Sequence, residues 1–245
     1  MLVIDCADGV RYRSHPALAK RYTIPMRDLR RLVHGARKSG LEIVPKLNFS
    51  RGEVHRHNNW MRYPREQWHE NFDTPAYWRR AFGIIDELIH ECRPERFFHI
   101  GMDEEEHRSY TQYVQAIRTL CSGLRRRGLK TVMWNDSAIS RAAGSLFVEK
   151  ARYAEQRVPR GVVQVLWNYH LVPRQDIRRI RARGLPLWGA PGRGDVRQAR
   201  AFRDDVLRNG GVGLLMTTWM PCRRSTRTQL LASVRAMGST YRGQN

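Results

Sequence analysis

The chain has 245 residues, of which 41% are hydrophobic, and this is enough to bury one sizeable core. Its formal net charge of +21 is extreme. Lysine occurs only at positions 20, 38, 46, 130 and 150, so nearly all of the 44 basic residues are arginines, scattered over the whole chain. We interpret this excess as a composition bias, with attraction to polyanions such as nucleic acid as the alternative.

Two absences narrow the class of protein. The four cysteines, at positions 6, 92, 121 and 222, show no C-x-x-C spacing, which argues against a thiolate zinc site and a disulfide scaffold. We expect free, mostly buried thiols. No apolar run approaches the roughly 20 residues of a membrane span, and the first residues do not form a signal peptide. We expect no membrane association, and a cytoplasmic location only if the natural start is Met1.

Seven short apolar runs alternate with longer amphipathic stretches. Their largely continuous apolar character is typical of strands that are buried on both faces of a parallel sheet. The runs are residues 2–6, 41–47, 97–102, 131–134, 162–167, 185–188 and 212–219.

The stretches between the runs predict helices, which start at a capping Ser or Thr and end at glycine. Residues 137–160 show no clear pattern. The starts are Thr23 with Pro25, Thr74 with Pro75, and Ser109; the ends are Gly40, Gly128 and Gly184, and a last helix covers residues 227–237.

This alternation predicts an α/β fold with a parallel sheet, and a doubly wound sheet and a closed barrel both fit it. Ala7-Asp8-Gly9, after the first run, offers no G-x-G-x-x-G phosphate loop, which disfavours a dinucleotide-binding sheet. We expect a (β/α)8 TIM-type barrel that forms a single catalytic domain over residues 1–245. It is incomplete at the N-terminus, because seven strands are counted and a barrel needs eight.

Polar and aromatic residues gather just after the C-terminal ends of these runs, which in a barrel converge at one mouth. Ordinary polar loops are the alternative interpretation. Tryptophans at strand ends would wall a sugar pocket, since a pyranose presents apolar C–H faces to aromatic rings. The polar residues are Asn48, Ser50, His55, His57, residues 103–106, Asn135, Asp136, Asn168 and Tyr169; the tryptophans are Trp134, Trp167, Trp188 and Trp219.

The adjacent carboxylates Asp103 and Glu104 are the candidates for acid–base chemistry. Like charges held close together raise one of their pKa values, which keeps a carboxylic acid protonated. Ordinary glycosidases place two carboxylates across the scissile bond. Adjacent carboxylates suit a mechanism in which the substrate's own acetamido group is the nucleophile. A solvated acidic loop is the alternative, since Glu105 and Glu106 continue the run.

The stretch from Phe97 to Glu104, FFHIGMDE, resembles the strand-four motif of glycoside hydrolase family 20, usually His-x-Gly-Gly-Asp-Glu. Residues 40–45 resemble that family's third strand, 132–136 its fifth and 217–219 its eighth. The resemblance runs from about residue 2 to residue 238. It implies an exo-acting β-N-acetylhexosaminidase-like enzyme that needs no metal and no organic cofactor.

The resemblance also implies roles for the matching residues. Glu104 matches the general acid, and Asp103 matches the residue that orients the 2-acetamido group. Met102 replaces the usual small residue, and Lys46 replaces an acidic one. Residues 2–6 align with strand two, so strand one and its sugar-gripping arginine are missing. The expected substrate-binding residues are His55, His57, Trp134, Asp136, Trp167, Tyr169 and Trp219.

The expected partner is a carbohydrate, and the unclosed barrel edge predicts association. The alternatives are an inactive or carbohydrate-binding truncated barrel, and a polyanion-binding protein whose affinity falls with salt. A metal-dependent hydrolase would use His55, His99 and Asp103. On an extended strand, however, His99 and Asp103 lie roughly 13 Å apart. We therefore interpret His99 as a buried, hydrogen-bonded residue.

Overall fold

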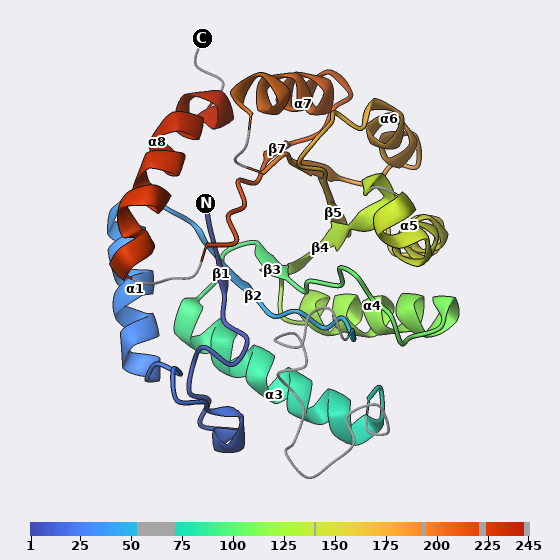
Figure 1. Cartoon of the computed structure of the whole chain (residues 1–245). Helices are drawn as coiled ribbons and strands as arrows, with labels where there is room; N and C mark the ends of the chain where they lie inside the picture. Colours follow the sequence, from blue (N-terminus) through green and yellow to red (C-terminus); the bar gives the residue numbers. More distant parts are fainter. Residues whose placement is uncertain (53–71, 140, 193–194, 221–223, 243–245) are drawn as a thin grey trace. The chain divides into compact units, whose positions relative to one another are not determined.

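A computed structural model describes residues 1–52, 72–139, 141–192, 195–220 and 224–242 (Figure 1). The chain forms two compact units, Met1–Met133 and Trp134–Asn245. His55, His57 and Cys222 lie outside the described residues. The other cysteines, Cys6, Cys92 and Cys121, are free, and the first two are buried, as expected.

The first unit alternates parallel strands with helices. The strands follow one another in chain order from β1 to β4, with Leu2 opposite Ile43, Lys46 opposite His99 and Phe97 opposite Lys130. Its elements are β1 (Leu2–Asp5), the 3-10 turn η1 (Pro16–Leu18), α1 (Met26–Lys38), β2 (Ile43–Lys46), α3 (Pro75–Cys92), β3 (Phe97–His99), α4 (Tyr110–Arg125) and the start of β4 (Lys130–Asn135).

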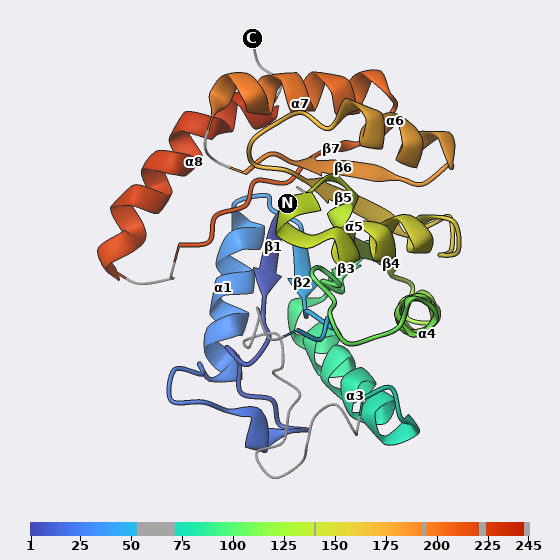
Figure 2. The same ribbon diagram turned by 45° about the vertical axis from the view of Figure 1, so that its right-hand side comes forward.

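The second unit continues the alternation from the end of β4, again with parallel strands in chain order (Figure 2). Its further elements are η3 (Asp136–Ala138), α5 (Arg141–Glu155), β5 (Val163–Trp167), α6 (Arg174–Ala182), β6 (Leu187–Ala190), α7 (Val196–Arg208), β7 (Gly213–Leu214), η4 (Arg224–Thr226) and α8 (Arg227–Arg242). The sequence prediction is thereby confirmed: seven parallel strands alternate with helices, in the order of a (β/α)8 barrel that lacks one strand.

Burial explains why the inner strands read as continuous apolar runs. Every residue of β2 is buried, as are all residues of β4 after Lys130. The helices of the first unit bury one face each against this layer, and that face supplies most of its core. The helix residues concerned are Leu29, Val33, Ile84, Ile85, Leu88, Ile117, Leu120 and Leu124.

Most predicted helix ends are confirmed. The Thr74 hydroxyl accepts the Tyr77 N–H at 3.2 Å, and Ser109 forms a capping box with Gln112. The glycines at 40, 128 and 184 all have φ between 72° and 75°, the left-handed conformation that ends a helix.

The prediction of Thr23 as a helix cap was wrong. Its hydroxyl donates to the Asp8 carbonyl at 2.8 Å and accepts the Lys20 N–H, so it closes a loop, and α1 starts after Pro25. The pattern in residues 137–160 was also missed, although α5 lies there. α7 was missed too, despite the Asp195 side chain that caps the Arg197 N–H at 2.7 Å.

Among the described residues, no helix is both long enough and apolar enough to cross a membrane.

A glycine inside α1 gives a test of the fold at a position remote from the chemistry. A Cβ on Gly35 would meet no atom within 4 Å. We expect Gly35→Ala to raise the free energy of unfolding by about 0.5–1 kcal/mol, because alanine loses less backbone entropy in a helix. Urea unfolding followed by circular dichroism measures the change.

The matched control is a second helical glycine. A Cβ on Gly123 in α4 would lie 2.1 Å from the Phe82 ring, so Gly123→Ala should show no such gain. Equal stabilisation by both substitutions would contradict the packing of α4 on α3.

Candidate active site

Two loops of the first unit continue the pairing of β2 with β3 past the ends of those strands. We call residues 47–52 the β2 loop and residues 101–108 the carboxylate loop. The Leu47 N–H donates to the His99 carbonyl, the Phe49 N–H to the Ile100 carbonyl (both 3.0 Å) and the Glu106 N–H to the Arg51 carbonyl (2.8 Å). The polar residues that follow the two strands are therefore held side by side, as the alternation predicted.

The Asn48 side chain links the two loops. Its Nδ2 donates to Asp103 Oδ1 at 2.6 Å, and its Oδ1 accepts the Met102 N–H at 3.0 Å. The same oxygen accepts the N–H and the hydroxyl of Ser50, at 3.0 and 2.8 Å. Asn48 and Asp103 are both buried, so these bonds fix the Asp103 carboxylate in one orientation.

Three residues of the carboxylate loop adopt left-handed backbone conformations. Gly101, Met102 and Glu104 have φ of 70°, 72° and 49°. Such a conformation costs a non-glycine residue roughly 1–3 kcal/mol and persists only where the surroundings enforce it. Met102 is fully buried, and the Tyr113 hydroxyl donates to its carbonyl at 2.7 Å. Its φ gives a physical reason for the small residue that the resemblance leads one to expect here.

Glu104 is a half-buried carboxyl whose charge is disfavoured. Burial, and then the charges of Asp103 and Glu106, raise its pKa to about 7. A carboxylic acid in this range is about half protonated in neutral solution and gives up its proton readily, which suits a general acid.

The neighbouring Glu105 has a structural role instead. It is buried, and it accepts the backbone N–H groups of Arg51, His107 and Arg108 at 2.8–2.9 Å, besides an ion pair with the Arg108 side chain at 2.6 Å. The acidic run is therefore not a uniformly solvated loop.

His99 is fully buried, as expected. Its Nδ1 accepts the Gly101 N–H at 3.0 Å, so this nitrogen carries no proton. Burial, followed by the charge of Lys46, holds the pKa of His99 well below its ordinary value, and the ring is neutral. Lys46 is itself buried and paired with Asp5. In the described part of the chain, no three His, Cys, Asp or Glu side chains are arranged to hold a metal ion.

The predicted residues of the second unit form a contiguous group. The Trp167 indole N–H donates to Asp136 Oδ1 at 2.8 Å, and the Trp167 and Tyr169 rings lie 5.4 Å apart. The Trp219 indole N–H and the Thr217 hydroxyl donate to the Tyr169 hydroxyl at 2.9 and 3.3 Å. The structure thus brings together Asp136, Trp167, Tyr169 and Trp219 within this unit.

The backbone of Gly192 packs closely against the Tyr169 ring. A Cβ on Gly192 would lie 2.7 Å from the ring, so this position excludes any larger residue. Trp219 is 63% exposed and lies beyond the end of β7, whereas Trp134 is buried near the end of β4. The sugar-binding role that the resemblance implies for these residues stays a prediction.

One expected strand end was wrong. Trp188 is the second residue of β6, which starts at Leu187, so it is a buried strand residue and does not lie at the rim. The apolar run 185–188 placed the strand too early, because residues 185 and 186 precede β6 and the strand continues to Ala190. Arg108 and Tyr113 were not predicted as site residues from the sequence. The charge of Arg108 is common in this chain, and nothing local marks it as buried.

No family model and no curated protein matches this sequence. Solved structures share its fold. A family 20 β-N-acetylhexosaminidase from Streptomyces coelicolor A3(2) aligns with a TM-score of 0.56 at 16% identity, covering 77% of this chain and 41% of that chain. A Streptomyces plicatus N-acetyl-β-hexosaminidase in complex with Thio-NAglucal gives 0.56 at 15% identity, with the same two coverages.

An L-ribulose 3-epimerase aligns with a TM-score of 0.51 at 11% identity, covering 99% of this chain and 94% of that chain. This chain therefore spans less than half the length of the two hexosaminidases but nearly all of the epimerase. At these identities the likeness shows the (β/α) barrel fold, which serves both a glycosidase and an epimerase.

Gly101 gives a direct test of how the two loops meet. A Cβ at this position would lie 2.2 Å from Asn48 Oδ1 and 2.6 Å from the Asn48 Cα. We expect Gly101→Ala to lower the free energy of unfolding by roughly 2–5 kcal/mol, from left-handed strain plus overpacking. Gly128→Ala is the control, since Gly128 has a similar φ of 75° and open space around it. It should cost only about 1–2 kcal/mol. Equal losses in denaturant titrations would rule out the close approach.

The raised pKa of Glu104 also predicts a pH-dependent stability. The folded state keeps the proton up to about pH 7, whereas the unfolded state releases it near 4.5, so this group destabilises the fold as pH rises between these values. Glu104→Gln removes the effect. Its melting temperature relative to the parent should therefore rise between pH 4 and pH 8. Glu95→Gln, at an exposed position, is the control. A difference that stays constant with pH would show that Glu104 is not held as described.

Proposed function

We propose that the chain is a glycoside hydrolase that removes terminal N-acetyl-β-hexosamine residues, with Glu104 as general acid and Asp103 as the residue that orients the acetamido group. The observation that carries the proposal is a half-buried Glu104 with a pKa of about 7, next to an Asp103 carboxylate fixed by Asn48 at 2.6 Å. The motif resemblance and the shared fold support it. The proposal treats residues 1–245 as one catalytic domain.

The adjacent carboxylates divide the proposed chemistry between them. In the first step the acetamido oxygen attacks C1 while the glycosidic bond breaks, and Glu104 gives its proton to the departing oxygen. The acetamido group becomes a cyclic oxazolinium ion, whose positive N–H faces the Asp103 carboxylate. The Asn48 amide donates to the Asp103 carboxylate at 2.6 Å and so holds it in one orientation for this task.

In the second step the Glu104 carboxylate takes a proton from water. The water oxygen attacks C1, the bond between C1 and the acetamido oxygen breaks, and the acetamido group is restored. Two inversions at C1 retain the β configuration. Glu104 is protonated again at the end of the cycle. A pKa near neutrality lets it donate a proton in the first step and accept one in the second.

The test uses two nitrophenyl glycosides that differ only at C2. We expect release of nitrophenol from 4-nitrophenyl N-acetyl-β-glucosaminide and none from 4-nitrophenyl β-glucoside, which lacks the nucleophile. Because protonated Glu104 is required, kcat/KM should fall about tenfold per pH unit above pH 7. Glu104→Gln should lower kcat/KM by on the order of 10²–10⁴ while the protein stays folded.

Full activity in folded Glu104→Gln would refute the assigned acid. Equal cleavage of both glycosides would refute the acetamido mechanism. Saturable binding of N-acetylglucosamine without any cleavage would identify a carbohydrate-binding barrel in place of an enzyme.

A further inference from the structure

Arg108 is a fully buried cation at the end of the carboxylate loop. Its guanidinium donates to Glu105 at 2.6 Å and to the Phe49 carbonyl at 2.7 Å. It also forms a two-pronged pair with Asp73, at 2.8 and 2.9 Å. A guanidinium makes such a set of bonds because its donors lie in one rigid plane.

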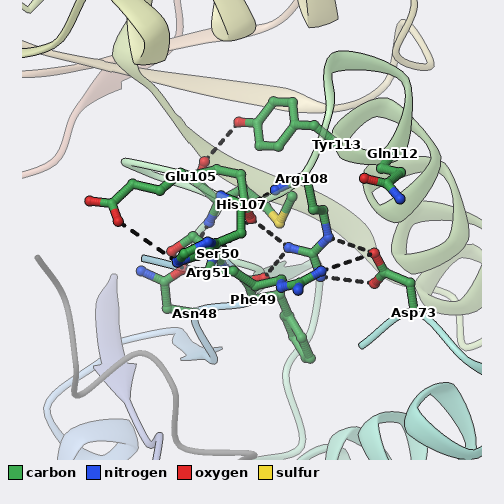
Figure 3. Close-up of polar contacts among 12 residues, drawn as sticks. Asn48, Phe49, Ser50, Arg51, Asp73, Glu105, His107, Arg108, Gln112 and Tyr113 are labelled. Atoms are coloured by element: carbon green, nitrogen blue, oxygen red, sulfur yellow. Dashed lines mark hydrogen bonds and ion pairs between the residues drawn. The ribbon is translucent and has the colours of Figure 1, made fainter. Parts of the chain in front are cut away.

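These bonds join three segments that are distant in sequence. Figure 3 shows the Arg108 side chain running from the carboxylate loop to Asp73, which precedes α3, and past Phe49 of the β2 loop. Glu105 adds a second link to the β2 loop, because its carboxylate also accepts the Arg51 N–H at 2.9 Å. The carboxylate loop is therefore tied to the β2 loop and to the N-terminal end of α3.

Glu104 lies between two anchored neighbours. Asn48 holds the Asp103 side chain on one side, and Arg108 holds Glu105 on the other. Glu104 itself has the strained φ of 49°. We expect release of either neighbour to let the backbone relax to an ordinary conformation and to turn the Glu104 carboxyl toward water.

We propose that Arg108 is a positioning residue that keeps the Glu104 carboxyl in its half-buried orientation by clamping Glu105, Phe49 and Asp73. The catalytic effect of Arg108 rests on the proposed function. The clamp itself and the orientation of Glu104 do not depend on that function. A merely stabilising role is a poor account of this cluster, because apolar side chains of similar size often stabilise a core as well as a buried ion pair does.

The first variant is Arg108→Lys, which keeps the positive charge but cannot form the planar, two-pronged contacts. We expect kcat to fall on the order of 10- to 100-fold with KM within about threefold, since a small misplacement of a catalytic group affects the chemical step most. The pKa of Glu104 should fall from about 7 toward the ordinary value of 4.5 as the carboxyl meets water. NMR titration of ¹³C-labelled glutamate side chains measures it, with Glu104→Gln to assign the signal.

The direction of this pKa change separates positioning from simple electrostatics. Arg108 and Lys carry the same charge, so the substitution changes no charge near Glu104. Loss of the positive charge, as in Arg108→Met, would by itself raise the pKa of a nearby carboxyl. A fall in the pKa of Glu104 in Arg108→Lys therefore reports movement of its carboxyl into solvent.

A second variant covers the case in which Arg108→Lys fails to fold. Asp73→Asn weakens the far end of the clamp at a side chain that is 25% exposed. Asn tolerates the φ of 63° at this position, so the backbone is not strained further. The expected result is the same reduction of kcat without a matching change in KM, at smaller size.

The control is another arginine–aspartate pair that links α4 to α3. Arg127 contacts Asp86 in the same two-pronged way, with one contact of 2.7 Å, away from the carboxylate loop. Asp86→Asn should leave kcat, KM and the Glu104 titration unchanged.

Folded Arg108→Lys or Asp73→Asn protein with parental kcat and an unmoved Glu104 titration would overturn the inference, and so would equal effects from Asp86→Asn. If the parent cleaves no glycoside but its Glu104 still titrates near 7 and shifts down in Arg108→Lys, the proposed function falls and the positioning role stands.

Discussion

The hydrogen bonds of the Asn48 side chain are the constraint on which the candidate site depends. This one uncharged amide group binds the Asp103 carboxylate, the Met102 N–H, and the N–H and hydroxyl of Ser50. It therefore links the segments that follow two adjacent strands. The join leaves no room at Gly101 for a Cβ. Gly101 fits this close approach because it has no Cβ and adopts the left-handed φ of 70° without steric cost.

Buried polar contacts hold the strained backbone of this turn in place. Two non-glycine residues, Met102 and Glu104, hold unfavourable backbone conformations. The Tyr113 hydroxyl and the Arg108 guanidinium fasten the chain on either side of them. The result is a carboxyl that is partly removed from water and close to other negative charges, and both effects favour its protonated form. The raised pKa of Glu104 follows from its burial and from the charges of Asp103 and Glu106.

The fold limits function less than this local chemistry does. Parallel strands in chain order bring their C-terminal loops to one edge, and many unrelated reactions use that arrangement. The likeness to both hexosaminidases and an epimerase illustrates the point. The choice of a glycosidase rests on the paired carboxylates and the environment of Glu104, which is a property of a few side chains and not of the barrel.

The sequence by itself determined the repeat of strands and helices, because burial makes the inner strands, such as β2 and β4, apolar and capping residues mark helix ends. It also determined that Asp103 and Glu104 follow β3. It failed where local signals mislead, as at Thr23, whose hydroxyl bonds to Asp8 and Lys20 in place of a helix end. Arg108 could not be distinguished among so many arginines.

Only the tertiary structure decided how the environments of the adjacent carboxylates differ. Glu104 and Glu105 are neighbours of the same type, yet one is a half-buried acid and the other is a buried anchor with four donors. The difference depends on contacts with residues about 54 positions away, such as the bond from the Arg51 N–H to Glu105. Such contacts leave no local pattern in a sequence, because they form only when β2 pairs with β3.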